Sequence, residues 1–173
     1  MKDPNSSPRV IVLIGVAGSG KTTVGIKIAQ ELGWEFYDAD QFHSEENIEK
    51  MARGVPLTDA DRWPWLDRLN DLIRDSLEND RPAVLACSAL KRVYRQRLLR
   101  DTRRAALVFL RGGFDLIYER LQDRQDHYME AGMLQSQFAA LEEPEEALTV
   151  EIESEPDEIV DEILRRLGLE REA

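Results

Sequence analysis

Residues 10–23, VIVLIGVAGSGKTT, join five consecutive apolar residues to a glycine-rich turn. The apolar run Val10 to Ile14 predicts a strand that is buried on both faces. It leads directly into Gly15-x-x-x-x-Gly20-Lys21-Thr22, which matches every position of the phosphate-binding P-loop pattern. The glycines allow a tight turn in which successive backbone N–H groups face one concave space, at the positive end of the helix that follows. The sequence therefore predicts a bound nucleoside triphosphate, ATP or GTP, with Mg²⁺.

Two side chains of this loop have predicted roles in addition to those of its backbone. The Lys21 ammonium is placed to contact the β- and γ-phosphates, and the Thr22 hydroxyl is placed to coordinate Mg²⁺. The alternative is a glycine-rich turn with a chance lysine, and the complete match between a buried strand and a helical pattern argues against it. The predicted nucleotide-binding residues of the loop are Gly15, Val16, Ala17, Gly18, Ser19, Gly20, Lys21, Thr22 and Thr23.

Length and composition predict one domain built around one core. The chain has 173 residues, of which 42% are hydrophobic, and 34 acidic against 23 basic side chains give a formal net charge of −11. Such a chain is a poor partner for nucleic acid or for an anionic membrane, because both need a basic face. The single cysteine, Cys87, fits a reducing compartment, and since no signal peptide or spanning segment is visible we expect a cytoplasmic protein. Residues 1–8 are expected to be a disordered lead, followed by a single P-loop domain over residues 9–170.

Apolar runs alternate with helical periodicity along the chain, which is typical of a parallel sheet covered by helices on both faces. Strands are predicted over residues 10–14, 34–38, 83–87, 105–110 and 148–152. Helices are predicted over residues 20–32, 41–53, 59–78, 90–100, 114–121, 134–141 and 154–167, with Thr58 as an N-cap and Gly33 and Gly168 as stops. Residues 123–133 are rich in charge and poor in periodicity, and we expect them to form a mobile flap. Ligands of such sheets bind beyond the carboxyl ends of the strands, so the residues at those ends are the candidates for a site.

Two carboxylates, Asp38 and Asp40, leave the second predicted strand with alternate-residue spacing. One can face the metal while the other faces an acceptor pocket. A hydroxyl that accepts a phosphoryl group needs a carboxylate to orient it and to take its proton, and Asp40 is our candidate for this base. Asp38 is the candidate for a ligand of the metal or of its water. The alternative is that both only cap the next helix.

Further polar side chains follow the second and third predicted strands. His43 either holds a substrate hydroxyl or only starts a helix in water, and its residue type does not choose between these interpretations. Cys87 ends an apolar strand, where we expect a buried, inert thiol. Ser88 and Lys91 stand one turn apart at a predicted helix start, where a hydroxyl and an ammonium could bind a polar substrate.

Three cationic side chains lie at or within the expected flap: Arg120, Arg124 and His127. Closure of such a flap places positive charge against the transferring phosphoryl group and excludes water. The alternative is a solvated, charged helix end, but the grouping favours function. Arg124 therefore joins Lys21 and Asp40 as a catalytic candidate.

Six motifs together resemble those of one family of small kinases. They are GVAGSGKT (15–22), DADQFH (38–43), NIEKMARGVPLTDADRWPWL (47–66), ACSALKRVYR (86–95), RLQDRQDHYM (120–129) and MLQSQFAALEEP (133–144). The chain resembles gluconokinases, P-loop kinases that phosphorylate D-gluconate to 6-phosphogluconate with ATP. The resemblance runs from about Val10 to Ile163, and only its first motif is shared with many other kinases.

This resemblance implies a three-layer α/β fold of the nucleoside-monophosphate-kinase type, similar to shikimate kinase, with five parallel strands in the order 2-3-1-4-5. It implies a mobile substrate-binding segment over about residues 41–80 and a lid over about residues 120–135. The implied reaction is in-line transfer of the ATP γ-phosphoryl group to the C6 hydroxyl of D-gluconate, with Mg²⁺. Relatives are often dimers, so a homodimer is allowed, although nothing in the composition shows an interface.

By the same resemblance, Asp40 is the base and Arg62 anchors the substrate, since a bidentate guanidinium suits the C1 carboxylate of gluconate. Arg120 and Arg124 would cover the phosphates and the adenine, and the loop at Pro156 would border the base. The residues implied in substrate binding are Asp40, His43, Lys50, Met51, Arg62, Ser88, Lys91, His127 and Gln137.

The sequence departs from the family pattern at Asp126, which stands before the lid histidine where the family commonly has glycine. Two other functions stay open. One is a related kinase for another hydroxylated acid, such as shikimate or another sugar acid. The other is a nucleotide-binding regulatory protein without catalysis, and the intact Lys21, Thr22 and Asp40 argue against it.

Overall fold

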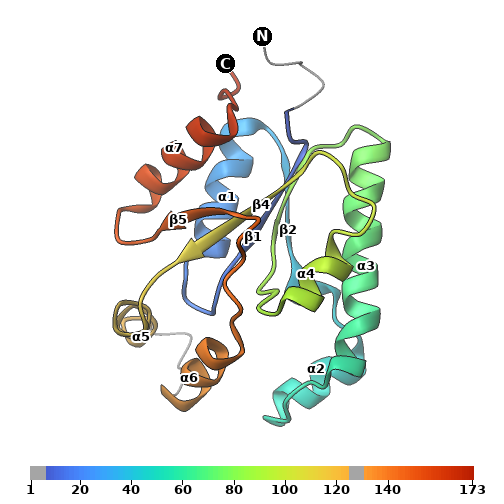
Figure 1. Ribbon diagram of the computed structural model, residues 1–173, viewed down its shortest axis with the longest axis vertical. Helices are drawn as coiled ribbons and strands as arrows, with labels where there is room; N and C mark the ends of the chain where they lie inside the picture. The colour runs from blue at the N-terminus through green and yellow to red at the C-terminus, as the bar shows by residue number, and fades with distance from the viewer. Residues whose placement is uncertain (1–6, 125–130) are drawn as a thin grey trace.

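The computed structural model describes residues 7–124 and 131–173, so most of the expected lead over residues 1–8 falls outside the described residues. Figure 1 shows a central sheet with helices on both sides. Its strands are β1 (Val10–Ile14), β2 (Glu35–Asp38), β3 (Ala83–Ala86), β4 (Ala105–Arg111) and β5 (Leu148–Glu151). Every pairing among them is parallel, and the strand order is β2-β3-β1-β4-β5. This confirms the predicted α/β P-loop fold.

Helices fill the connections between the strands. They are α1 (Lys21–Leu32), the 3₁₀ helix η2 (Ala39–Phe42), α2 (Glu45–Ala52), α3 (Asp59–Glu78), α4 (Arg92–Leu98), α5 (Phe114–Gln122), α6 (Ala131–Ala140) and α7 (Pro156–Leu167). Because β3 lies between β1 and β2, the segments that follow these three strands emerge at one edge of the sheet. The P-loop, η2 and the β3–α4 loop therefore meet there, as the parallel arrangement requires.

Apolar layers lie on both faces of the sheet, because the side chains of the buried strand β1 alternate between them. On one face, Leu13 packs in a cluster with Ile28 of α1 and Ile163 of α7. On the other face, Val12 packs in a cluster with Leu66 of α3. Burying each such side chain contributes about 1.5–3 kcal/mol, so the two layers fix the strand ends on which the site is built.

The predicted limits of α3 and the predicted stops of α1 and α7 are confirmed. Thr58 and Asp61 form a capping box: Thr58 Oγ1 accepts from the Asp61 N–H at 3.1 Å, and Asp61 Oδ2 accepts from the Thr58 N–H at 2.9 Å. Gly33 and Gly168 end their helices in left-handed backbone, with φ of 65° and 68°. Within the described ranges, none of the helices has the length and apolar character needed to span a bilayer.

Three predicted helices are wrong in extent. The predicted helix over residues 134–141 begins already at Ala131 in α6, so residues 131–133 of the expected flap are helical. The other two differences lie at the site edge. The predicted helix over residues 41–53 is divided: η2 ends at Phe42, and α2 begins after Ser44, whose Oγ accepts the Asn47 N–H at 3.1 Å. The predicted helix over residues 90–100 begins only at Arg92, because Ala89 has left-handed backbone with φ of 39°. Ser88 therefore lies in a loop, and Lys91 is the N-cap residue of α4 rather than a helix-surface neighbour of Ser88.

Candidate active site

The loop between β1 and α1 forms a backbone cradle. Gly18 and Gly20 have φ of 79° and 97°, and a Cβ atom at Gly18 would lie 2.7 Å from Leu121 of α5. Glycine is required here both by the left-handed backbone and by the packed neighbour. Gly20 is the N-cap of α1 but gives it no side-chain cap, and the first turn of α1 carries no acidic side chain. The first N–H groups of α1 are therefore left for an external anion, which the helix dipole also favours.

Ser19 gives a second indication that this loop binds a ligand. Its side chain is 1% exposed, and its Oγ is the one buried side-chain oxygen or nitrogen in the described ranges that has no hydrogen-bond partner. Leaving such a hydroxyl unpaired costs about 1–3 kcal/mol. The loop thus contains a polar group whose partner the protein itself does not supply, and a bound phosphate fits that need.

Lys21 is folded back over the loop. Its Nζ donates to the carbonyl oxygens of Gly15 at 2.9 Å and Val16 at 3.0 Å. Burial lowers the pKa of the ammonium to about 8, and attraction to Asp40 and Asp38 offsets only part of that effect. The Arg124 charge is near enough to lower this pKa slightly further. A phosphate in the cradle would supply the negative charge that this desolvated ammonium lacks.

The end of β2 places two aspartates within electrostatic reach of Lys21. Asp38 is the N-cap of η2, and its Oδ1 accepts the Asp40 N–H at 3.0 Å, so the capping alternative holds for Asp38. The Asp40 side chain is open to solvent on one side. Desolvation by the surrounding protein and the Asp38 charge nevertheless raise the Asp40 pKa, against the opposing effect of Lys21 and His43. A carboxyl group with a raised pKa beside a phosphate cradle is typical of a general base.

His43 is buried and immobilised rather than being the solvated helix start that its residue type also allowed. It is 9% exposed, and its ring stacks on Trp65 with 4.3 Å between the centroids and 15° between the planes. Burial lowers the His43 pKa; Asp40 acts to raise it, and Arg62 and Arg68 lower it further. His43 is therefore a neutral imidazole at neutral pH.

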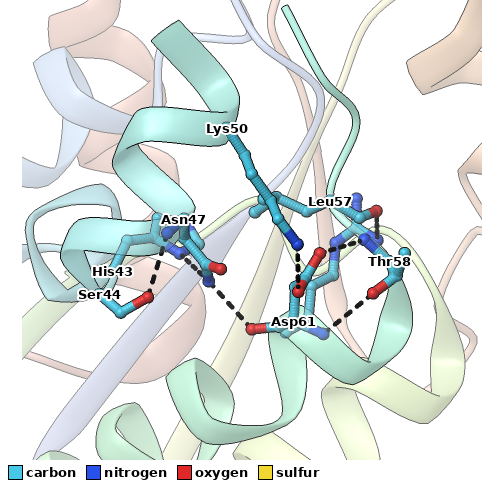
Figure 2. A network of polar contacts seen from close by, with 8 residues as sticks. His43, Ser44, Asn47, Lys50, Leu57, Thr58 and Asp61 are labelled. Carbon is cyan, nitrogen blue, oxygen red and sulfur yellow. Dashed lines mark hydrogen bonds and ion pairs between the residues drawn. The ribbon is translucent and has the colours of Figure 1, made fainter. Parts of the chain in front are cut away.

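Figure 2 shows that polar side chains join α2 to the start of α3. Asn47 Nδ2 donates to the Asp61 carbonyl oxygen at 2.9 Å, and Lys50 Nζ donates to Asp61 Oδ1 at 2.9 Å. The Thr58 N–H and the Lys50 ammonium lower the Asp61 pKa to about 2, so this pair is fully charged at neutral pH. Lys50 is thus paired within the protein, and Met51 of α2 is 43% exposed.

Two cations gather at the ring of Tyr94 in α4. The Arg62 guanidinium carbon lies 5.3 Å from the ring centroid, and Lys91 Nζ lies 5.7 Å from it. The Tyr94 hydroxyl donates to Asp59 Oδ1 at 2.5 Å, and burial together with this hydrogen bond raises the Tyr94 pKa to about 12. The predicted candidates Arg62 and Lys91 come from different elements, and the structure brings both to the same tyrosine ring. Arg62 is also held by the Leu57 carbonyl oxygen, to which it donates at 2.7 Å.

The loop that carries Ser88 and Lys91 is held by a buried arginine. Arg95 is 2% exposed and donates to the carbonyl oxygens of Ala89 at 3.0 Å, Leu90 at 3.0 Å and Glu142 at 2.8 Å. Left-handed backbone at a residue such as Ala89 costs about 1–2 kcal/mol. The hydrogen bonds from Arg95 offset that cost and fix the loop against the segment between α6 and β5.

The remaining predicted residues lie on the nucleotide side. Gln137 of α6 contacts the P-loop directly, because its Oε1 accepts the Ala17 N–H at 2.7 Å. Arg120 of α5 donates to the Ile152 carbonyl oxygen at 2.7 Å, which places it beside the β5–α7 loop that leads to Pro156. His127 and Asp126 lie outside the described residues, as does the central part of the expected lid.

Comparison with known proteins identifies the family. Residues 17–168 match the family model described as shikimate kinase. A probable gluconokinase of Mus musculus is 48% identical over 155 residues, covering 80% of this chain and 84% of that protein, and the gluconokinase of Gluconobacter oxydans is 43% identical with coverage of 94% and 93%. The crystal structure of a gluconokinase from Sinorhizobium meliloti 1021 matches with a TM-score of 0.84 at 41% identity, over 93% of this chain and 92% of that one. The chain belongs to the gluconokinases, within the shikimate kinase family.

Sequence reasoning missed three residues of this gluconokinase site: Asn47, Tyr94 and Arg95. Each lies inside a motif quoted above, but Asn47 and Tyr94 do not have residue types that mark them as ligands of a sugar acid or phosphate. A signal existed for Asn47 and Tyr94, which follow His43 and Lys91 by four and three residues, a spacing that brings side chains together near a helix start. Arg95 gave no such signal, since in sequence it is one more cation in a basic run.

A gluconokinase needs few protein ligands for Mg²⁺, and this site offers few. Residues 7–124 and 131–173 hold no group of three or more His, Cys, Asp or Glu side chains arranged for a metal ion. Mg²⁺ in kinase sites keeps several waters and uses one or two protein groups together with substrate phosphates. Thr22 at the start of α1 and Asp38 at the end of β2 fit this description. Cys87 does not, since burial raises its pKa to about 12 and leaves the inert thiol that the sequence predicts.

Proposed function

We propose that this protein transfers the γ-phosphoryl group of ATP to the C6 hydroxyl of D-gluconate, in line and with Mg²⁺, to give 6-phospho-D-gluconate. One observation carries the proposal. Lys21, which lies in the backbone cradle for phosphate, and Asp40, which follows β2, are close enough to affect each other's pKa. Membership of the gluconokinase family supports gluconate as the acceptor.

On the donor side, the backbone of residues 15–23 holds the phosphates and Lys21 contacts the β- and γ-phosphates. Thr22 and Asp38 would hold Mg²⁺, which when bound would supply positive charge to the phosphate oxygens. Arg124 adds positive charge at the transferring group. Arg120 and the loop at Pro156 border the nucleotide, supported by the anchoring of Arg120 to the β5 exit.

On the acceptor side, Asp40 orients the C6 hydroxyl and takes its proton as the hydroxyl oxygen attacks the γ-phosphorus. The bond from that phosphorus to the β–γ bridging oxygen breaks, and ADP leaves. The raised pKa of Asp40 supports this role, because a stronger base accepts the proton more readily. His43 and Ser88 form hydrogen bonds with substrate hydroxyls.

The C1 carboxylate of gluconate is bound by Arg62 and Lys91, whose convergence on Tyr94 supports this assignment. Gln137 links α6 to the P-loop through the Ala17 N–H, which places it beside the phosphate site. Lys50 acts through its ion pair with Asp61 rather than on the substrate. His127 and Met51 stay proposed substrate residues on the family resemblance alone.

Two further parts of the proposal concern the protein in its cell. Its single, buried cysteine supports a cytoplasmic location. A homodimer is allowed by the family resemblance, and light scattering on the purified protein tests it.

The test is ADP release by the purified protein with MgATP and a panel of acids. We expect turnover with D-gluconate, little with shikimate and other sugar acids, and a phosphate ester on C6 by ³¹P NMR. Turnover with shikimate and none with gluconate would assign the protein to the other substrate class. No turnover with any acid, despite MgATP binding, would support a regulatory nucleotide-binding protein instead.

A further inference from the structure

Asn47 is a buried residue next to the site, 5% exposed, and its surroundings determine how its amide is oriented. The atom that lies 2.9 Å from the Asp61 carbonyl oxygen must be the NH₂ group, because a carbonyl oxygen can only accept. The same NH₂ group lies 3.4 Å from His43 Nδ1 (Figure 2). An amide NH₂ can only donate, so His43 Nδ1 is the acceptor and carries no proton.

The plane of the His43 ring is fixed as well. Trp65 stacks on it, and Trp65 Nε1 donates to the Ala39 carbonyl oxygen at 2.7 Å, next to Asp40 in the chain. The charged groups that face His43 are Asp40 from η2 and Arg62 and Arg68 from α3. The ring is therefore held in position and in tautomer by two different neighbours.

We propose that Asn47 is a positioning residue: it holds His43 as the neutral tautomer protonated on Nε2, so that His43 donates a hydrogen bond to an oxygen of the substrate. The identity of that oxygen, a hydroxyl or carboxylate oxygen of gluconate, rests on the proposed function. A neutral donor suits this place beside the base. An imidazolium would pair with Asp40 and weaken it as a base, and the tautomer protonated on Nδ1 would present a lone pair where a donor is needed.

The experiment observes the tautomer directly. The chain has two histidines, so the ¹⁵N imidazole spectrum of labelled protein is simple, and His43→Gln assigns it. We expect the wild type to show Nε2–H at His43. In Asn47→Asp the carboxylate can only accept, so we expect Nδ1–H, together with a rise of about tenfold in the gluconate KM and an unchanged ATP KM.

Asn70 provides a matched control. It is also a buried amide, 2% exposed, and its Nδ2 donates to the carbonyl oxygens of Leu98 at 2.9 Å and Arg100 at 2.8 Å. Asn70→Asp should lower the melting temperature while leaving the His43 tautomer and the gluconate KM unchanged. In a His43→Gln background, Asn47→Asp should no longer affect the gluconate KM.

Several results would overturn the proposal. They are Nδ1–H at His43 in the wild type, an unchanged tautomer and gluconate KM in Asn47→Asp, or an equal effect of Asn70→Asp. If Asn47→Asp does not fold, Asn47→Ser and the wild-type tautomer decide the question. If the wild type does not phosphorylate gluconate, the proposed function is wrong, but the His43 tautomer can still be measured in the free protein.

Discussion

The two halves of the site are built in different ways. The phosphate half is one contiguous loop, residues 15–23, whose binding groups are mainly backbone N–H groups at the start of α1. The acceptor half collects side chains from η2, α2, α3 and the β3–α4 loop, and most of them contact one another: His43 with Trp65 and Asn47, and Arg62 and Lys91 with Tyr94.

This difference has consequences for substitution. The backbone cradle requires its glycines, and apart from them it uses few side chains, which act alone and have no substitute. In the acceptor half each side chain is supported by a neighbour, so a substitution there is expected to change both the substrate KM and the stability of the fold. The predictions below test that contrast.

The largest effect is expected at Lys21. Lys21→Met should lower kcat about a thousandfold, because it removes the charge that stabilises the transferring phosphoryl group. The melting temperature should not fall, since the desolvated ammonium, with its pKa lowered to about 8, is a cost to folding. For the same reason kcat/KM for ATP in the wild type should decline as the pH rises through about 8, because free Lys21 then loses its proton.

Lys27 is the control for Lys21, since it lies six residues further along α1 and pairs with Asp157 at the surface. Lys27→Met should leave kcat unchanged. If Lys21→Met retained more than a tenth of the activity, the backbone N–H groups of the cradle would be sufficient for catalysis without the Lys21 charge. The phosphate half would then depend on side chains even less than we propose.

The next effect is expected at Asp40. Asp40→Asn should lower kcat about a hundredfold with a small change in the gluconate KM, because it removes the base and keeps the shape. Since the Asp40 pKa is raised, the base is lost by protonation at a higher pH than for an ordinary carboxyl group, so wild-type activity should fall on the acid side earlier than such a group would predict. Activity that falls in equal measure through kcat and KM would make Asp40 a substrate-positioning residue.

The same contrast explains how much could be predicted from the sequence. The P-loop and the Thr58 N-cap follow from contiguous patterns, and the strand order follows from the family resemblance; the strand order and the cap are confirmed. Asp38 and Asp40 follow from the rule that ligands bind beyond strand ends, and the structure places both within reach of Lys21.

The interior contacts of the acceptor half could not be predicted in this way. The division of the helix over residues 41–53 depends on Ser44 capping α2, and the late start of α4 depends on the left-handed backbone of Ala89. The Ala89 loop is held by Arg95, six residues further on, and Arg95 also donates to the distant Glu142 carbonyl oxygen, contacts that no local periodicity records. The Ser44 cap is local, since Ser44 precedes Asn47 by three residues, but it lies within a segment whose pattern predicts one continuous helix. The ion pair of Lys50 with Asp61, eleven residues away on another helix, could not be predicted from a local pattern either.

The smallest effect on activity, and the most direct test of the contrast, is expected at Arg95. Arg95→Met leaves the buried carbonyl oxygen of Ala89 and the partly buried ones of Leu90 and Glu142 without their donor, which should destabilise the fold by about 3 kcal/mol in urea unfolding. The gluconate KM should rise about tenfold, because the loop carrying Ser88 and Lys91 loses its support. Arg95→Lys, which keeps the charge, should lie between, and Arg92→Ala on the exposed side of α4 should change neither quantity.

The ATP KM of Arg95→Met decides whether the two halves are independent. Glu142 closely follows α6, and Gln137 of α6 accepts a hydrogen bond from the P-loop at Ala17, so one short segment touches both halves. An unchanged ATP KM would mean that this segment only supports the acceptor loop. A rise in the ATP KM in step with that for gluconate would mean that residues 137–142 couple the halves, and Gln137→Ala should then remove the coupling while leaving the stability loss of Arg95→Met in place.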